Sequence, residues 1–200
     1  MFSFLKRKNS KKEKTILIFP GRDQDPEEIM SLYRGNKRIE ESFNLIAVSP
    51  ETEWYPKPNG LLNQSEAVSG ICKSVKNVNE FVNRLSSDEN VDPLKTILSG
   101  YSAGGVMALE VSMSNRFMAA VCHSGCILDV SRVKKNQHRT PCLMIHARDD
   151  NTFGYGERFM PTKNALLREG HVITTIEKQD GGHSIAAVDV EYAASFLCGL

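Results

Sequence analysis

The chain has 200 residues, of which 40% are hydrophobic and 24% are charged, and its formal net charge is +1. This length and composition are typical of one globular domain, and a net charge so close to zero argues against a nucleic-acid-binding protein. No stretch approaches the roughly 20 apolar residues of a membrane-spanning helix. The short apolar start precedes a basic cluster, whereas a secretory signal has its charges first. We therefore expect a cytoplasmic protein.

The first fourteen residues are rich in positive charge. Six of them are lysine or arginine, and these follow Phe2 and Phe4. We expect residues 1–14 to form a flexible basic leader and residues 15–200 to form a single domain. A short basic segment with apolar side chains can also dock on an anionic membrane. A weak membrane-surface contact through the leader is therefore an alternative to a purely solubilising tail.

From residue 15 onward, short apolar runs alternate with longer amphipathic segments. Strands that alternate with helices predict an α/β fold with a mostly parallel sheet that is flanked by helices. The segment 65–85 places its apolar side chains at helical spacing, which predicts one buried face. The predicted strands are residues 15–19, 45–49, 96–99, 119–123, 142–146 and 172–177, and the predicted helices are residues 26–33, 65–85, 104–112, 156–168 and 186–197.

A glycine-rich turn separates the predicted strand 96–99 from the predicted helix 104–112. Its sequence, Gly100-Tyr101-Ser102-Ala103-Gly104, has G-x-S-x-G spacing. Glycines on both sides of the serine allow a strained turn that exposes a nucleophilic hydroxyl at the start of a helix. There, the helix dipole and the N–H of Ala103 can stabilise an oxyanion. Such a turn can also serve packing or bind phosphate, but the strand before it and the second glycine after it favour Ser102 as a nucleophile.

A serine hydroxyl needs a histidine base and an acid that orients the base. Where this turn carries the nucleophile, the acid and then the histidine follow it in the chain. His183 lies in a glycine-rich loop after the last predicted strand, whereas His123 and His146 end apolar runs and fit hydrogen-bonding roles better. His146 also precedes the acid candidates, which is the wrong order. The pattern leaves both Asp149 and Asp150 open as the acid and predicts that the other one binds backbone N–H groups of the turn.

A second oxyanion donor is expected in the loop after the first strand of the domain. This loop contains Pro20-Gly21-Arg22, in which the glycine permits a tight turn. The N–H of Arg22 is therefore the candidate donor. An ordinary Pro-Gly turn is the alternative interpretation.

The five cysteines are odd in number, and each lies in or beside an apolar run. Cys122 and Cys126 flank His123, but no second ligand pair with zinc-type spacing accompanies them. The pattern is typical of free thiols in a reducing compartment. We predict that the protein has no metal site.

These motifs together resemble the phospholipase/carboxylesterase family of α/β hydrolases, close to its acyl-protein thioesterase and small dienelactone hydrolase-like branches. The resemblance runs from about residue 15 to the C-terminus, and the serine and histidine motifs are specific as a pair. The matching features are the Gly21-Arg22 loop, Ala47-Val48-Ser49-Pro50 with Trp54-Tyr55-Pro56, Asp92-Pro93, Gly100-Tyr101-Ser102-Ala103-Gly104-Gly105, Ser124-Gly125, His146-x-x-x-Asp150 and Gly182-His183-Ser184.

The resemblance implies a role for several residues. The family places its acid four residues after the strand-ending histidine, which favours Asp150 over Asp149. It takes its oxyanion donors from the positions of Arg22 and Ala103. The chain departs from the family at Pro20, where members usually carry histidine, and this difference suggests an unusual substrate.

The resemblance also implies a compact α/β-hydrolase fold with a trimmed sheet. The chain between Ser102 and Asp150 is too short for a large helical cap, so we expect an open site. Trp54 and Tyr55 are candidate substrate-binding walls of this site, with a purely structural role as the alternative.

These features predict a serine hydrolase that cleaves carboxylic esters or thioesters through a Ser102–Asp150–His183 triad and an acyl-enzyme intermediate. The substrate would be a small molecule or an acylated partner, and this chemistry needs no cofactor. The alternative is a non-catalytic ligand-binding or scaffold protein that retains the fold. The sequence predicts neither the acyl-length preference nor the oligomeric state.

Overall fold

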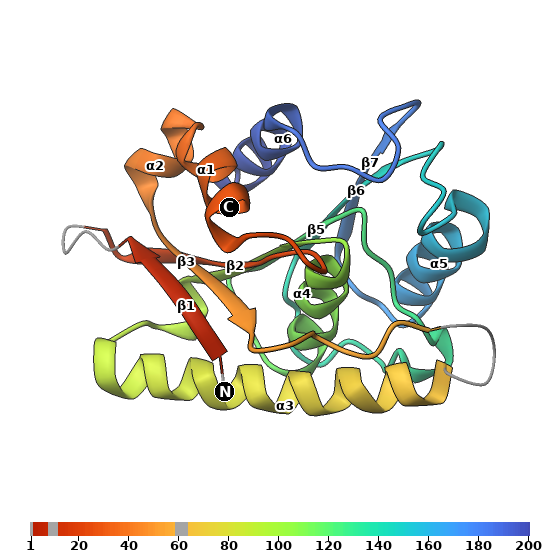
Figure 1. Cartoon of the computed structure of the whole chain (residues 1–200), viewed down its shortest axis with the longest axis horizontal. Coiled ribbons are helices and arrows are strands. Elements are labelled where there is room, and N and C mark those ends of the chain that lie inside the picture. Colours follow the sequence, from red (N-terminus) through yellow and green to blue (C-terminus); the bar gives the residue numbers. More distant parts are fainter. Residues whose placement is uncertain (1, 8–11, 59–63) are drawn as a thin grey trace.

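A computed structural model describes residues 2–7, 12–58 and 64–200. A seven-stranded sheet with the order β1-β3-β2-β4-β5-β6-β7 crosses the molecule (Figure 1). All neighbouring strands are parallel except β1 and β3, which confirms the predicted mostly parallel sheet. The strands are β1 (Phe2–Arg7), β2 (Lys14–Phe19), β3 (Phe43–Pro50), β4 (Thr96–Tyr101), β5 (Ala119–His123), β6 (Cys142–Ala147) and β7 (Ile173–Lys178).

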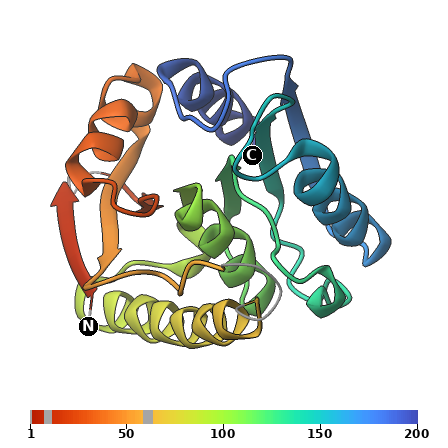
Figure 2. The same cartoon turned by 45° about the vertical axis from the view of Figure 1, so that its right-hand side comes forward.

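Helices cover both faces of the sheet (Figures 1 and 2). One face packs against α1 (Pro26–Arg34), α2 (Lys37–Ser42) and α6 (Ala187–Cys198), and the other packs against α3 (Gln64–Glu89), α4 (Ala103–Ser114) and α5 (Met160–Arg168). Short helical turns at η2 (Pro93–Lys95), η3 (Val130–Arg132) and η4 (Tyr155–Phe159) complete the architecture. Among the described helices, none combines the length and the apolar composition of a membrane-spanning segment.

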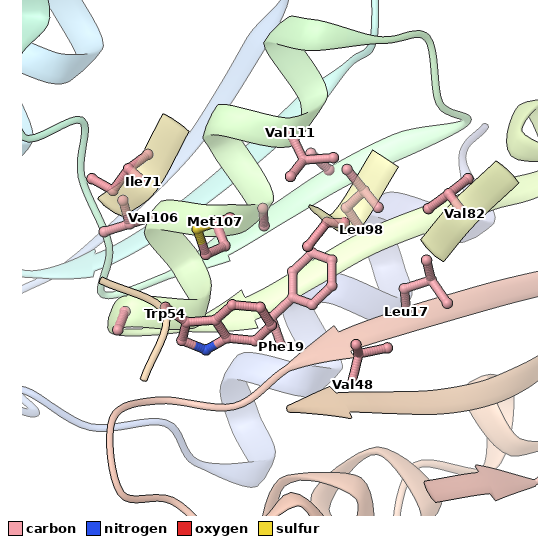
Figure 3. Packing of buried hydrophobic residues seen from close by; sticks show 14 of the residues in the cluster. Leu17, Phe19, Val48, Trp54, Ile71, Val82, Leu98, Val106, Met107 and Val111 are labelled. Atoms are coloured by element: carbon pink, nitrogen blue, oxygen red, sulfur yellow. The ribbon is translucent and has the colours of Figure 1, made fainter. Parts of the chain in front are cut away.

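The central strands are apolar on both faces because each face is covered by helices. Along β2, Ile16 and Ile18 contribute to the core under α1 and α6, whereas Leu17 and Phe19 contribute to the core under α3 and α4. Figure 3 shows the second of these cores, where Phe19 lies against the indole of Trp54. This arrangement fixes the strand ends from which the loops of the site emerge.

The start of the chain differs from our expectation of a flexible leader. Phe2–Arg7 form β1, an antiparallel strand on the edge of β3, so the sheet begins before residue 15. The side chains of Phe2 and Phe4 lie on the same face of β1 and pack on Phe81 of α3. Their ring centroids lie 6.0 and 5.6 Å, respectively, from the ring centroid of Phe81. Phe4 and Leu5 remain 46% and 40% exposed, so membrane contact through this strand stays a prediction. Residues 1 and 8–11 lie outside the described part of the chain.

Three buried polar side chains, those of Tyr33, Ser99 and His123, form a hydrogen-bonded group below the site, between the sheet and α1. The hydroxyl of Tyr33 lies 3.0 Å from His123 Nε2 and also hydrogen-bonds with Ser99. His123 is only 1% exposed. Burial lowers the pKa of His123 to about 4, because the imidazolium form would lose its hydration. This histidine is therefore neutral near neutral pH.

The lowered pKa of His123 predicts how stability depends on pH. The unfolded chain takes up this proton near pH 6.5 and the folded chain only near pH 4, so the free energy of unfolding falls as the pH drops through this window. The contribution is on the order of 3 kcal/mol. Urea unfolding of the wild type and of His123→Gln at pH 7.5 and 4.5 measures it. We expect the variant to lose less stability between the two pH values, and an equal loss in both proteins would contradict the assignment.

Candidate active site

Ser102 occupies a strained turn between β4 and α4. Its backbone has φ 53° and ψ −117°, which is a costly conformation for a residue with a side chain. A Cβ at Gly100 would lie 2.2 Å from the carbonyl oxygen of Gly104, and a Cβ at Gly104 would lie 1.9 Å from that of Phe19. Only glycine fits at these two positions, so the G-x-S-x-G spacing reflects close contact between β2, β4 and α4.

The structure brings together the three residues of the predicted triad. Ser102 Oγ lies 2.8 Å from His183 Nε2, and His183 Nδ1 lies 2.8 Å from Asp150 Oδ2. These residues follow β4, β7 and β6 respectively, and their loops meet at the carboxyl ends of the strands. Such geometry allows the serine to donate to the imidazole and the imidazole to donate to the carboxylate.

Asp150 is 3% exposed and is held by several hydrogen bonds. The backbone N–H groups of Thr152 and Phe153 donate to its Oδ1 over 2.8 and 2.9 Å. Burial acts to raise the pKa of this carboxyl, but the hydrogen bonds from the imidazole and the two N–H groups outweigh it and lower the pKa. Asp150 is therefore an ionised acceptor that can orient His183.

Asp149 has a different role from the one we predicted for the aspartate that is not the acid, because the N–H groups of the turn donate to Asp150 and not to Asp149. The N–H of Gly182 donates to Asp149 Oδ1 over 2.8 Å, which ties the histidine loop to the loop after β6. Tyr101 also holds this loop, because its hydroxyl donates to the carbonyl of His183 over 2.8 Å. Sequence analysis missed Tyr101, although it is the variable residue before the nucleophile in the motif.

His146 is buried beneath the acid and is not positioned as a base. Its Nε2 lies 2.7 Å from the carbonyl oxygen of Phe153, which requires a proton on this nitrogen, and 3.7 Å from Asp150 Oδ2. Burial lowers the pKa of His146, and the ionised Asp150 counteracts this only in part. A neutral His146 thus fixes the turn whose N–H groups hold the acid.

The loop with Arg22 lies directly beside the nucleophile. A Cβ at Gly21 would lie 3.5 Å from the Cβ of Ser102 and 2.9 Å from the ring of Tyr101. The N–H of Gly21 donates to the side chain of Gln24 over 2.9 Å. The Arg22 guanidinium donates to the carbonyl of Tyr55 over 2.8 Å. These contacts place the backbone of residues 21–22 opposite the start of α4, where Ala103 lies.

Trp54 and Tyr55 are not exposed at the surface of the site, although Trp54 contributes to the lining of a cleft beside Ala103. Each is only 3% exposed, because both rings pack into the core under α3 and α4. The indole N–H of Trp54 donates to the carbonyl of Pro20 over 2.8 Å, and the ring of Tyr55 lies below the Arg22 guanidinium, 5.5 Å away. The two aromatics therefore support the Pro20–Gly21–Arg22 loop from the core side.

The cysteines are free, and Cys122, Cys126 and Cys142 are buried. Within residues 2–7, 12–58 and 64–200, no group of three or more His, Cys, Asp or Glu side chains is arranged to hold a metal ion.

The fold is similar to that of solved esterases over almost the whole chain. Esterase PE8 superposes with a TM-score of 0.82 at 20% identity, covering 94% of this chain and 92% of that one. A phospholipase/carboxylesterase from Dyadobacter fermentans has a TM-score of 0.79 at 15% identity, with coverage of 98% and 95%. A carboxylesterase from Mesorhizobium loti has a TM-score of 0.78 at 17% identity, with coverage of 100% and 94%. At these identities the likeness establishes the α/β-hydrolase fold.

No curated protein matches this sequence. The sequence profile of the phospholipase/carboxylesterase family, in contrast, matches residues 40–199. The matched range includes Ser102, Asp150 and His183 but begins after the loop that carries Arg22. The match makes this protein a carboxylesterase-type hydrolase and argues against the alternative of a non-catalytic scaffold. The chain therefore belongs to the phospholipase/carboxylesterase family.

Proposed function

We propose that the protein is a serine esterase that hydrolyses carboxylic esters or thioesters through an acyl-enzyme on Ser102. The observation that carries this proposal is the continuous chain of 2.8 Å contacts from Ser102 through His183 to Asp150. A histidine that is hydrogen-bonded on both sides in this way can take the serine proton while the carboxylate stabilises the imidazolium. The substrate is a small ester or an acyl group carried by a larger partner.

In the proposed reaction, Ser102 Oγ attacks the acyl carbon as its proton passes to His183 Nε2. The carbonyl oxygen becomes an oxyanion that accepts hydrogen bonds from the N–H groups of Arg22 and Ala103, and one such donor contributes about 3 kcal/mol to an oxyanion hole. His183 then protonates the leaving alcohol or thiol. Water attacks the acyl-enzyme by the same route and releases the acid, so the cycle needs neither a metal nor an organic cofactor.

The free cysteines support a further part of the proposal, namely that the enzyme works in the reducing cytoplasm. Two of them, Cys122 and Cys126, are fully buried close to the nucleophile helix, and burial raises the pKa of both thiols. Neither thiol is therefore an activated nucleophile that competes with Ser102.

Labelling with a fluorescent fluorophosphonate tests for an activated serine at this site. We expect the wild type to label and Ser102→Ala and His183→Ala to lose the signal, because the probe reacts only with a serine that a base has activated. Ser195→Ala, which changes an exposed serine on α6, is the matched control and should label like the wild type. A folded wild type that does not label, or labelling that persists in Ser102→Ala, would overturn the proposal.

The indole of Trp54 offers a test of the oxyanion loop that leaves the triad intact. Trp54→Phe keeps an aromatic ring in the core but removes the hydrogen bond to the carbonyl of Pro20. A less firmly held loop misplaces the N–H of Arg22, so we expect kcat to fall roughly 10- to 100-fold while KM changes little. Steady-state kinetics on an activated ester measure the effect, with thermal unfolding as the check on folding. An unchanged kcat would show that this hydrogen bond does not support the loop.

A further inference from the structure

A cleft of about 390 Å³ opens beside the nucleophile turn. It lies between residues 20–26, which lead from β2 into α1, and the end of β3 with the loop after it (residues 49, 50 and 52–54). Ser3 of β1 also lines the cleft, which reaches Ala103 at the start of α4. Because Arg22 and Ala103 both line it, the cleft begins where the oxyanion would form. Its volume is near the lower end of the range of roughly 300–1,000 Å³ for small-molecule sites.

The position of His183 decides which part of a substrate enters this cleft. His183 has to protonate the leaving group, so the alcohol or thiol must lie near the loops after β6 and β7. In the sheet order, β4 with Ser102 separates those strands from β2 and β3, whose loops form the cleft. Phe153 and Tyr101, which contact His183, do not line it. The acyl group is therefore the part that extends into the cleft.

The charged side chains of the cleft have an excess of carboxylates. Among the described residues that line it, Arg22 is the one cation, and it forms an ion pair with Glu53. Asp23 and Asp25 also line the cleft and add two negative charges. One carboxylate oxygen of Asp25 accepts from the N–H of Glu27 at the start of α1. Both side chains are exposed, so these negative charges lie at the mouth of the cleft, where it opens to water.

We propose that this cleft is the acyl-binding subsite and that Asp23 and Asp25 make it select short acyl groups without negative charge, with a preference for a cationic end. The proposal rests on the serine-esterase mechanism above. A carboxylate in the acyl chain meets two like charges, whereas an ammonium group meets two opposite ones. In a cleft open to water, such interactions change kcat/KM by about 10-fold in each direction, and salt screens them.

Three methyl esters of matched length test the selectivity. They are the monomethyl ester of glutarate (anionic), the methyl ester of trimethylammoniobutyrate (cationic) and its tert-butyl analogue, which has the same shape without charge. We expect the wild type to cleave the cationic ester fastest and the anionic ester slowest, mostly through KM. High salt should reduce the differences in kcat/KM between the three esters. Equal kcat/KM for the neutral and anionic esters would overturn the proposal.

The double variant Asp23→Asn/Asp25→Asn assigns the selectivity to these two carboxylates. Asparagine has nearly the same shape and also caps helices, so α1 should keep its N-cap. We expect the three esters to be cleaved at similar rates by this variant. Asp88→Asn, an exposed residue at the far end of α3, is the matched control and should retain the wild-type order. Wild-type selectivity in the double variant would overturn the assignment.

The same experiment separates failure of the subsite from failure of the mechanism. If the wild type reacts with the fluorophosphonate but cleaves none of the three esters, the acyl-binding proposal is wrong and the serine-esterase proposal stands. If cleavage persists in Ser102→Ala, the serine-esterase proposal is wrong and the subsite loses its basis.

Discussion

The strained backbone at Ser102 is the constraint on which the rest of the site depends. It requires β2, β4 and the start of α4 to approach so closely that only glycine fits at positions 100 and 104. That packing places the serine at the carboxyl ends of the strands, above a core that is buried on both faces. The loops after β2, β6 and β7 then reach it from two sides. The N–H of Ser102 itself donates to the carbonyl of His123 over 2.9 Å, which ties the turn to β5.

Much of this arrangement could be predicted from the sequence, because local chemistry determines it. The six parallel strands follow from apolar runs of strand length, and all six are present. Spacing identified Ser102, and chain order with loop composition identified His183. The choice of Asp150 over Asp149 came from family resemblance. The hydrogen bonds of Thr152 and Phe153 to Asp150 supply a physical reason for it, since they hold this carboxylate toward the imidazole.

The features that the sequence did not predict depend on contacts between distant segments. Two alternating phenylalanines, Phe2 and Phe4, form too short a pattern to distinguish a strand from a flexible tail. The segment forms a strand because it pairs with the edge of β3 and packs on the ring of Phe81. Helix α2 has six residues and was missed for the same reason of length. Trp54 and Tyr55 follow β3 at the edge of the sheet that carries the site, which is a position where substrate-binding residues are expected. They are buried because α3 packs across them, which no local pattern reveals.

The central claim is that Ser102 carries the acyl group during turnover. Mass spectrometry of the enzyme, acid-quenched while it hydrolyses an activated ester, tests this claim most directly. The account predicts a mass increase equal to the acyl group on the peptide that contains Ser102, which disappears once the substrate is consumed. Sustained hydrolysis without this adduct, or an adduct on another residue that turns over at the same rate as the reaction, would contradict the account.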